Sequence, residues 1–264
     1  MSAAWHDGPE LRAFFTAVQF LTRLPVPGGE ARDLSTFRDD IRQGLQYFPL
    51  IGAGLGLLTA LALVTFDIVF PFAVAVLLTL ALEARLTGAF HDDAVADFCD
   101  AFGGGWTREE VLALLKDSRI GSYGALGLGF AVAMRAVGLI SLQEAWQAAA
   151  VLIISGAAGR FMILLVMAIV PPVPQREGLA KDVGQIVETT GLARALMWVA
   201  PVLILALWLD WTGFVLAVIA SAAFLFWFQN YLMRRIGGVT GDCLGFAAYA
   251  VMILTTLAYA REPM

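Results

Sequence analysis

The chain has 264 residues, of which 59% are hydrophobic and 15% are charged, and its formal net charge is −5. Its mean hydropathy is +0.78, and a soluble domain carries about a quarter charged residues. The composition therefore excludes an ordinary soluble protein and predicts a multi-pass membrane protein. The modest negative charge gives no reason to expect a nucleic-acid partner. Two cysteines, Cys99 and Cys243, provide no disulfide framework.

The first apolar run, Ala13–Leu21, is too short to cross a bilayer, because a membrane helix needs about 20 apolar residues. We expect this run to lie at the membrane interface or to re-enter the membrane. Seven longer apolar stretches follow, and each is interpreted as a span. They cover residues 45–65, 69–90, 122–140, 146–170, 193–209, 213–232 and 244–260. The expected fold is all-α: a polytopic membrane helical bundle of about seven transmembrane helices plus the N-terminal interfacial or re-entrant segment.

Three longer polar connections separate these spans, at residues 91–121, 171–192 and 233–243. Of the 17 lysines and arginines, 13 lie before the first span or in and beside these three connections. Arg261 alone is expected on the opposite side. Since cytoplasmic segments of membrane proteins are enriched in Lys and Arg, the N-terminus and all three connections are predicted to be cytoplasmic. Every motif below would then share one face.

The first connection opens with three aspartates, Asp93, Asp97 and Asp100, spaced as i, i+4 and i+7. On a helix this spacing aligns their side chains in one narrow acidic stripe. Aligned carboxylates repel each other unless a cation lies among them, and Mg²⁺ prefers such oxygen ligands. The stripe therefore predicts a magnesium site at the membrane edge. The alternative is a solvated helix start that interacts favourably with the helix dipole, which is how we interpret the neighbouring Asp92.

The same connection continues with Lys116, Ser118 and Arg119, followed by Gly121 and Gly124. Cations neutralise phosphate charge, and glycines allow backbone N–H groups to approach phosphate oxygens. Alone, this segment is better explained as a basic turn that anchors the chain at the membrane. Together with the acidic stripe, it favours a diphosphate held through Mg²⁺.

The last connection places Gly237, Gly238 and Gly241 around a single aspartate, Asp242, directly before a span. Glycines disfavour helix formation, so this pattern predicts a tight loop that aims Asp242 at a site. Three roles remain open for Asp242: a fourth metal ligand, a base, or the N-cap of the last helix.

Ionisable residues inside predicted spans are functional candidates. Arg135 and Arg160 lie deep in their spans, so each should face the interior with a partner, in a structural ion pair or a substrate contact. Glu83 and Arg85 lie near a predicted helix end, where they can extend to the interface. His91 is about 160° from Asp93 on a helical wheel and joins the acidic stripe only if the helix starts after it.

Five sequence blocks, in this order, resemble those of the cobalamin synthase family, the adenosylcobinamide-GDP ribazoletransferases of bacterial inner membranes. The blocks cover nearly the whole chain and are Phe20–Pro27, Phe48–Gly52, Thr87–His91, Lys116–Gly121 and Gly238–Gly245. The chain departs from the family pattern at Ala94 and Ala101, where the family usually has glycine. It departs again at Tyr249, where the family often has an acidic residue, which argues against a fifth carboxylate at the metal.

The resemblance implies a single integral-membrane transferase domain over residues 1–264. Its reaction would join α-ribazole, or α-ribazole 5′-phosphate, to the cobinamide phosphate of adenosylcobinamide-GDP with release of GMP. The implied metal ligands are Asp93, Asp97, Asp100 and Asp242 on Mg²⁺. The implied catalytic residues are Asp97, Asp242, Lys116 and Arg119. The implied substrate-binding residues are Lys116, Ser118, Arg119, Tyr123, Arg160 and His91.

The resemblance also implies a location in the bacterial inner membrane with a cytoplasmic active site. The expected partners are the corrinoid nucleotide, α-ribazole, the lipid bilayer and other cobamide-assembly enzymes.

Two other functions compete. A CDP-alcohol phosphatidyltransferase also places spaced aspartates over Mg²⁺, but its motif carries a longer aspartate series with an Ala-Arg inside it, whereas Phe98 and Cys99 follow Asp97 here. A divalent-cation transporter would place carboxylates near the bilayer midplane on broken helices, whereas these aspartates are predicted to lie in a cytoplasmic connection.

Overall fold

The computed structural model describes residues 8–26, 34–174 and 189–261, and these residues are overwhelmingly helical. The α-helices are α1 (Pro9–Leu21), α2 (Leu34–Gly44), α3 (Phe48–Asp67), α4 (Phe72–Thr87), α5 (Phe90–Gly104), α6 (Arg108–Leu114), α7 (Ser122–Ser141), α8 (Ala145–Ile169), α10 (Thr189–Leu209), α11 (Trp211–Arg235) and α12 (Gly241–Tyr259). A single 3₁₀ turn, η1 (Leu45–Tyr47), joins α2 to α3. The all-α prediction is confirmed.

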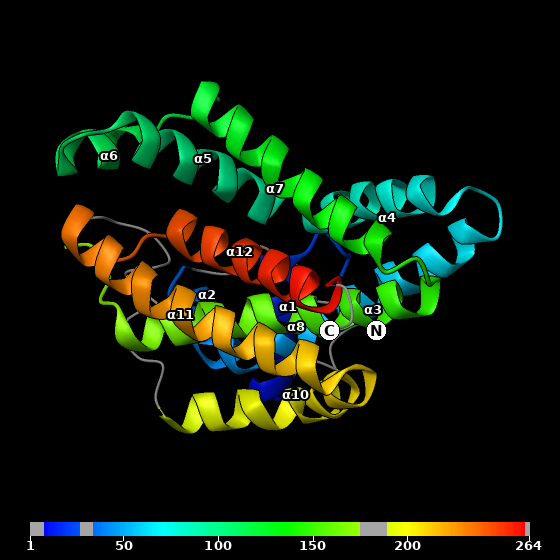
Figure 1. Cartoon of the computed structure of the whole chain (residues 1–264). Coiled ribbons are helices and arrows are strands. Elements are labelled where there is room, and N and C mark those ends of the chain that lie inside the picture. Colours follow the sequence, from blue (N-terminus) through cyan, green and yellow to red (C-terminus); the bar gives the residue numbers. More distant parts are fainter. Residues whose placement is uncertain (1–7, 27–33, 175–188, 262–264) are drawn as a thin grey trace.

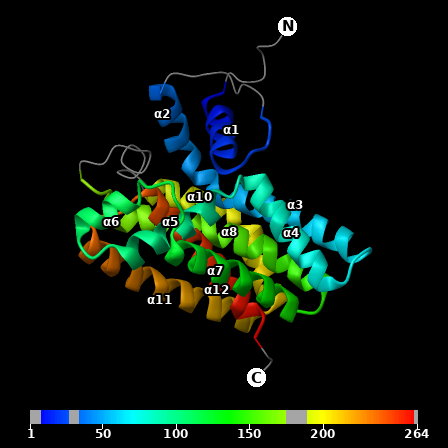
Figure 2. The ribbon, with the colours of Figure 1, turned by 90° about the horizontal axis from the view of Figure 1, so that it is seen from above.

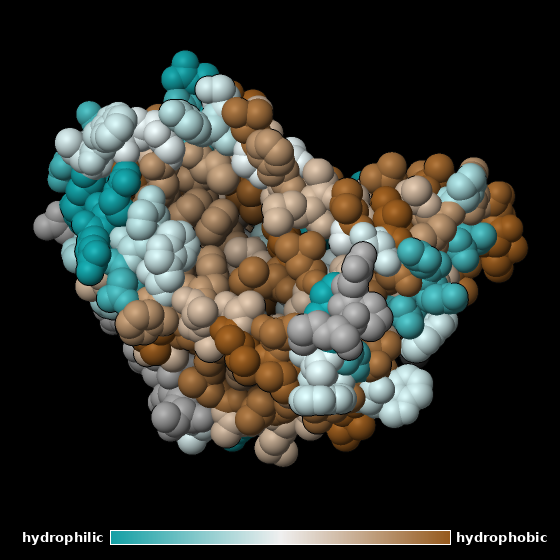
Figure 3. Space-filling view, in the orientation of Figure 1, coloured by the Kyte–Doolittle hydropathy of each residue, from teal (hydrophilic) through white to brown (hydrophobic). Residues whose placement is uncertain are grey.

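Within the described residues, six helices are long and apolar enough to cross a membrane: α3, α7, α8, α10, α11 and α12. The pair α4 and α5 adds a seventh crossing when it is counted as one bent span. The chain is thus a multi-pass membrane protein. Figure 3 shows a broad apolar surface across the middle of one face, with polar residues gathered toward its edges.

The second predicted span is wrong in one respect, because it is not continuous over residues 69–90. Helix α4 ends at Thr87, Gly88 and Ala89 both take left-handed backbone angles, with φ of 67° and 56°, and α5 leaves at a bend of 90°. The predicted connection 91–121 accordingly consists largely of helices. It begins with α5 and contains α6, and residues 105–107 and 115–121 connect them to their neighbours.

The long helices lie beside one another, and in Figure 1 the end of α11, the start of α12 and α6 all lie at the left-hand end. Helix α8 packs centrally between α3 and α12. At the crossing of α3 and α8, a Cβ on Gly52 or Gly56 would collide with the α8 backbone at Gly156 or Leu152. These two glycines therefore allow the close contact of α3 with α8, whereas a Cβ on Gly54 would have no atom within 4 Å.

The N-terminal apolar run forms α1, whose 13 residues are too few for a span, as expected. Its buried face includes Ala13, Ala17 and Leu21 and packs against α2. Figure 2 shows that α1 and α2 form a pair outside the layer of long helices. The predicted connection 171–192 is described only at its two ends, because residues 175–188 lie outside the described ranges.

The turn between α3 and α4 and the turn between α10 and α11 lie at the end of the molecule opposite α6 (Figure 1). Thiol labelling at these turns therefore tests the membrane topology. In a background without Cys99 and Cys243, we expect Ile68→Cys and Trp211→Cys to react with an impermeant thiol reagent added to intact cells. Both positions are highly exposed. Glu109→Cys, in α6, should react only after the membrane is opened, because the sequence predicts 13 of the 17 basic residues on its side of the membrane. The reverse labelling pattern would invert the proposed orientation.

Candidate active site

The acidic stripe lies on α5, and the structure brings the last-loop aspartate to it. Asp97 lies within electrostatic range of Asp93, Asp100 and Asp242. Helix α12 crosses α5 directly behind this point, where Gly245 packs on Ala94 so closely that no Cβ would fit. Carboxylates from two helices, α5 and α12, therefore lie in the same region of the molecule.

Asp100 has a structural role that the sequence did not indicate. Its carboxylate accepts the backbone N–H of Gly121 at 2.6 Å and that of Gly124 at 2.8 Å, so it caps the start of α7. A Cβ on Gly121 or Gly124 would meet this carboxylate. In this structure the two glycines make room for Asp100, whereas their spacing had suggested contact with phosphate.

The residues present suit Mg²⁺ by their chemistry, since all four are hard carboxylate donors. As placed, no three His, Cys, Asp or Glu side chains among the described residues are close enough together to hold a metal ion. Mg²⁺ usually binds through one or two carboxylates together with substrate phosphate oxygens and water. Its presence here stays a prediction, with Asp93, Asp97, Asp100 and Asp242 as the predicted ligands, of which Asp100 already accepts two backbone N–H groups.

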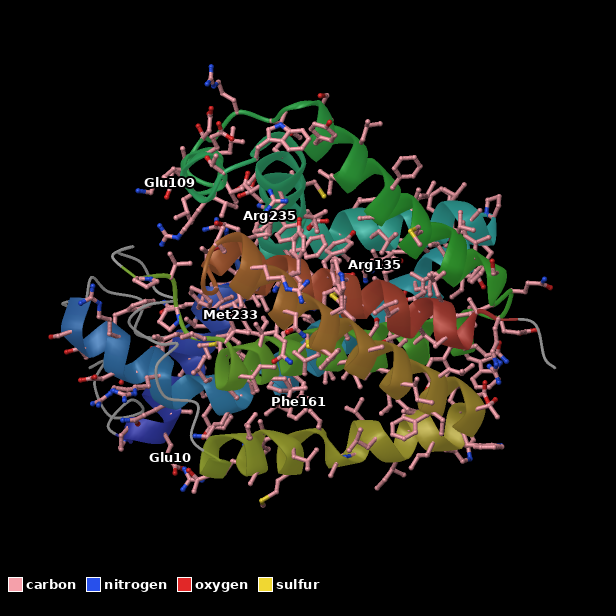
Figure 4. All side chains as sticks on the ribbon, turned by 60° about the vertical axis from the view of Figure 1, so that its left-hand side comes forward. Glu10, Glu109, Arg135, Phe161, Met233 and Arg235 are labelled. Atoms are coloured by element: carbon pink, nitrogen blue, oxygen red, sulfur yellow. The ribbon has the colours of Figure 1, made fainter. Side chains whose placement is uncertain are left out.

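Two reciprocal hydrogen bonds fasten the α5–α6 turn to the α11–α12 turn. Arg108 Nε donates to the carbonyl of Ile236 at 3.0 Å, and Arg235 Nη2 donates to the carbonyl of Gly105 at 2.6 Å. The Arg235 guanidinium also lies over the ring of Phe102 on α5, 5.7 Å from its centroid. Figure 4 shows Arg235 at the end of α11, on the side that faces α5 and α6.

The segment after α8 joins the same assembly. The N–H of Val239 donates to the carbonyl of Pro171 at 2.9 Å, and the N–H of Val173 donates back to Val239 at 3.1 Å. Gly238 is required here, because a Cβ would stand 2.7 Å from the Pro171 carbonyl oxygen. Parts of all three predicted connections therefore meet at one end of the molecule.

The N-cap interpretation of Asp242 is wrong. Thr240 is the N-cap of α12, and its hydroxyl accepts the backbone N–H of Cys243 at 3.4 Å. Asp242 lies in the first turn of α12, with the Thr240 hydroxyl 3.4 Å from its carboxylate. Its carboxylate lies within electrostatic range of Asp97 on α5, and the metal-ligand and base roles both stay open.

The predicted phosphate-binding residues lie on the exposed connection between α6 and α7. Lys116, Ser118 and Arg119 all face solvent. Arg119 forms a forked ion pair with Asp117, with Nη2 to Oδ2 at 2.6 Å and Nε to Oδ1 at 3.0 Å. These hydrogen bonds lower the pKa of Asp117 to about 2. Tyr123 is 56% exposed, and its ring covers Gly103 at the end of α5.

His91 and Arg160 lie apart from that exposed group. Helix α5 starts at Phe90, so His91 is helical and points away from the acidic stripe into the interior, where it is 3% exposed. Arg160 is 1% exposed, and its Nη1 lies 3.2 Å from the sulfur of Met252. Both ring nitrogens of His91 and the Nε of Arg160 are buried without a hydrogen-bond partner. The predicted substrate contacts thus form two groups, one exposed and one buried.

Sequence reasoning missed a buried polar cluster formed by Glu83, Asp92, Arg135 and Tyr249. Arg135 Nη2 pairs with Glu83 Oε2 at 2.9 Å and lies over the Tyr249 ring at 5.3 Å, and Asp92 hydrogen-bonds to Tyr249. Figure 4 shows Arg135 between α7 and the core. The predicted partner for Arg135 is confirmed. The interpretations of Glu83 as an interfacial residue and of Asp92 as a solvated helix start are wrong.

Comparison with known proteins decides the family. The model of the family described as cobalamin-5-phosphate synthase matches residues 13–260. The chain belongs to this family.

Its curated relatives include proteins named adenosylcobinamide-GDP ribazoletransferase. The protein of Leptothrix cholodnii is 39% identical over 90% of each chain. That of Vibrio parahaemolyticus is 35% identical over 96% of this chain and 94% of its own. The relative from Leptospira interrogans is 31% identical over 93% of both chains. No solved structure matches the chain.

Asp100 caps α7 and therefore stabilises the fold, whereas Asp97 has no such structural role. We expect Asp100→Ala to lower the free energy of unfolding by about 1–2 kcal/mol, because two backbone N–H groups at the start of α7 lose their acceptor. Asp97→Ala removes a charge from a repelling group and should leave stability unchanged or raise it. Thermal unfolding of both purified variants in detergent without divalent metal makes the comparison. Equal losses of stability would contradict the capping role.

Proposed function

We propose that the chain catalyses the ribazole transfer named for its relatives. Adenosylcobinamide-GDP and α-ribazole, or its 5′-phosphate, would give adenosylcobalamin, or its 5′-phosphate, and GMP. Relatives that carry this name match about nine-tenths of the chain or more. The structural observation that carries the proposal is the meeting of Asp97 with Asp242, beside a basic loop, at the polar end of a membrane bundle.

The chemistry is a phosphoryl-type displacement. The 3′-hydroxyl oxygen of the ribose forms a bond to the phosphorus attached to cobinamide, and the bond from that phosphorus to the GMP oxygen breaks. The hydroxyl proton passes to a carboxylate, and Asp242 and Asp97 are the two candidates for this role. Catalysis of this type depends mainly on positioning and on neutralising phosphate charge. Mg²⁺, held by Asp93, Asp97, Asp100 and Asp242, would supply part of that neutralisation.

The exposed basic loop between α6 and α7 would supply the remaining neutralisation of the phosphate charge. Lys116 and Arg119 face solvent next to the start of α7, which is bound to the acidic stripe through Asp100. Arg119 already holds the planar Asp117 carboxylate in a forked pair, and a phosphate presents a similar pair of oxygens. Binding of the diphosphate would exchange one acceptor for the other. Ser118 and Tyr123 flank the same surface and would contact the nucleotide.

The proposed location is the bacterial inner membrane with this face in the cytoplasm. The concentration of basic residues on the motif-bearing side supports that orientation. A cytoplasmic face also gives direct access to a nucleotide substrate and allows association with other enzymes of cobamide assembly.

A magnesium titration tests the metal assignment. Asp97→Asn keeps the side-chain size but removes a charged donor, so GMP release should need far more Mg²⁺ or cease. Folding should be retained, because no apolar contact is lost. The measurement is GMP release by purified protein in lipid, with adenosylcobinamide-GDP and α-ribazole, across a range of Mg²⁺ concentrations. Normal turnover at the wild-type Mg²⁺ concentration would reduce the acidic stripe to a solvated helix face.

Removal of the two cations in the α6–α7 connection should impair the use of adenosylcobinamide-GDP. Lys116→Ala and Arg119→Ala should each lower kcat/KM for adenosylcobinamide-GDP by the equivalent of about 2–4 kcal/mol, with little change in the Mg²⁺ requirement. Arg234→Ala is the matched control, because Arg234 is an exposed cation at the same end of the molecule. If all three variants lose activity equally, the effect is a general one of surface charge, and the diphosphate assignment fails.

A further inference from the structure

A small cavity of about 60 Å³ lies beside the start of α5, enclosed by residues from α1, α2, α3, α5, α8 and α12. Its walls are apolar except for His91. Three phenylalanines, Phe20, Phe48 and Phe90, form part of the wall, and Gly241 lies on the side nearest the last loop. No atom stands within 4 Å of where a Cβ on Gly241 would be, so this side is open.

His91 is the one group of this wall that can form strong hydrogen bonds through its side chain. A neutral imidazole has one donor and one acceptor nitrogen, and here both are buried without a partner. Buried polar groups in folded proteins are almost always paired with protein, water or a ligand. An unpaired imidazole on the wall of an otherwise apolar cavity therefore indicates that the cavity receives a group with its own hydrogen-bonding atom.

The aromatic walls restrict what that group is. Phe20 and Phe48 are stacked with ring centroids 5.9 Å apart, and Phe90 meets Phe20 edge to face at 5.3 Å. Phe90 also meets the His91 ring at 5.3 Å. Flat aromatic walls favour a planar aromatic ligand, and a single polar group fixes its orientation. A free phosphate or a metal ion would find no compensating charge on these walls.

The cavity is adjacent to the acidic stripe. Phe90 precedes Asp93 by three residues and Asp97 by seven, so it lies on the same face of α5. At 1.5 Å rise per residue, Asp93 is about 4.5 Å farther along the helix axis. Gly241, on the open side, directly precedes Asp242. A nucleoside with its base in the cavity would therefore hold its ribose beside Asp93 and Asp242.

We propose that this cavity receives the leading edge of the aromatic base of the acceptor nucleoside, and that His91 recognises the free ring nitrogen of that base. The inference rests on the proposed function, since it names the subsite for the acceptor of that reaction. His91 is then a residue that determines specificity, distinct from the groups that handle the phosphate.

The decisive experiment compares two acceptors of the same shape. Benzimidazole α-riboside has a free ring nitrogen, and indole α-riboside has a C–H in its place. The wild-type protein should prefer the benzimidazole acceptor by about tenfold in kcat/KM, the value of one hydrogen bond in a pocket built for it. His91→Phe should remove this preference by slowing the benzimidazole acceptor, while the Mg²⁺ requirement stays unchanged. His91→Gln, which keeps a donor and an acceptor, should restore part of the preference.

A binding measurement separates this inference from the proposed reaction. Equilibrium dialysis with free benzimidazole needs no transfer step, and the wild-type protein should bind it at least fivefold more tightly than His91→Phe. Gly241→Ala, which adds a methyl group on the open side without meeting another atom, should also weaken binding. If GMP is never released but these binding differences hold, the subsite stands and the reaction is wrong. If His91→Phe keeps the acceptor preference, or binds benzimidazole as well as wild type, His91 contacts only water and the inference is overturned.

Discussion

The arrangement of the site depends on one buried ion pair, between Glu83 of α4 and Arg135 of α7. Within an apolar bundle an unpaired charge is strongly unfavourable, so removal of either partner would leave the other uncompensated. The pair lies just before the 90° bend between α4 and α5, and Arg135 also contacts Tyr249 of α12. Asp92, in the first turn of α5, adds its own bond to Tyr249. Four helices are thereby held at the bend, and the direction of α5, which carries the acidic stripe, follows from it.

At the other end of α5, hydrogen bonds from arginines to backbone carbonyls, rather than an ion pair, hold the neighbouring turns together. Arg108 and Arg235 each donate to a carbonyl of the other's turn, and Val239 joins the segment after α8. A transporter would also place carboxylates on broken helices, and α4 with α5 is such a broken pair. The bend alone therefore does not exclude transport. Membership of the cobalamin-5-phosphate synthase family and the basic loop beside the aspartates favour transfer.

Much of the fold could be predicted from the sequence, and the predictions that were wrong failed for identifiable reasons. Apolar runs of adequate length located α3, α7, α8, α10, α11 and α12, because composition alone decides which helices suit a bilayer. The same criterion assigned residues 69–90 to one continuous span and left residues 91–104 in a polar connection, whereas the structure has α4 and α5 with a 90° bend between them. The contacts that hold these helices join residues far apart in the chain. Arg135 is 52 residues from Glu83, and Gly121 is 21 residues from Asp100. Such pairings arise from tertiary structure and have no local pattern.

The cap formed by Asp100 also explains how an acidic stripe is tolerated on one helix. Two backbone N–H groups at the positive end of α7 offset the charge of this carboxylate, which lessens its repulsion with Asp97. A carboxylate has about four acceptor positions, so two N–H bonds leave Asp100 able to contact a further cation. The cap formed by Asp100 also fixes the position of the neighbouring loop. Because Asp100 binds the start of α7, the basic loop that precedes Gly121 is fixed relative to the aspartates. One side chain thus couples the predicted metal position to the predicted phosphate position.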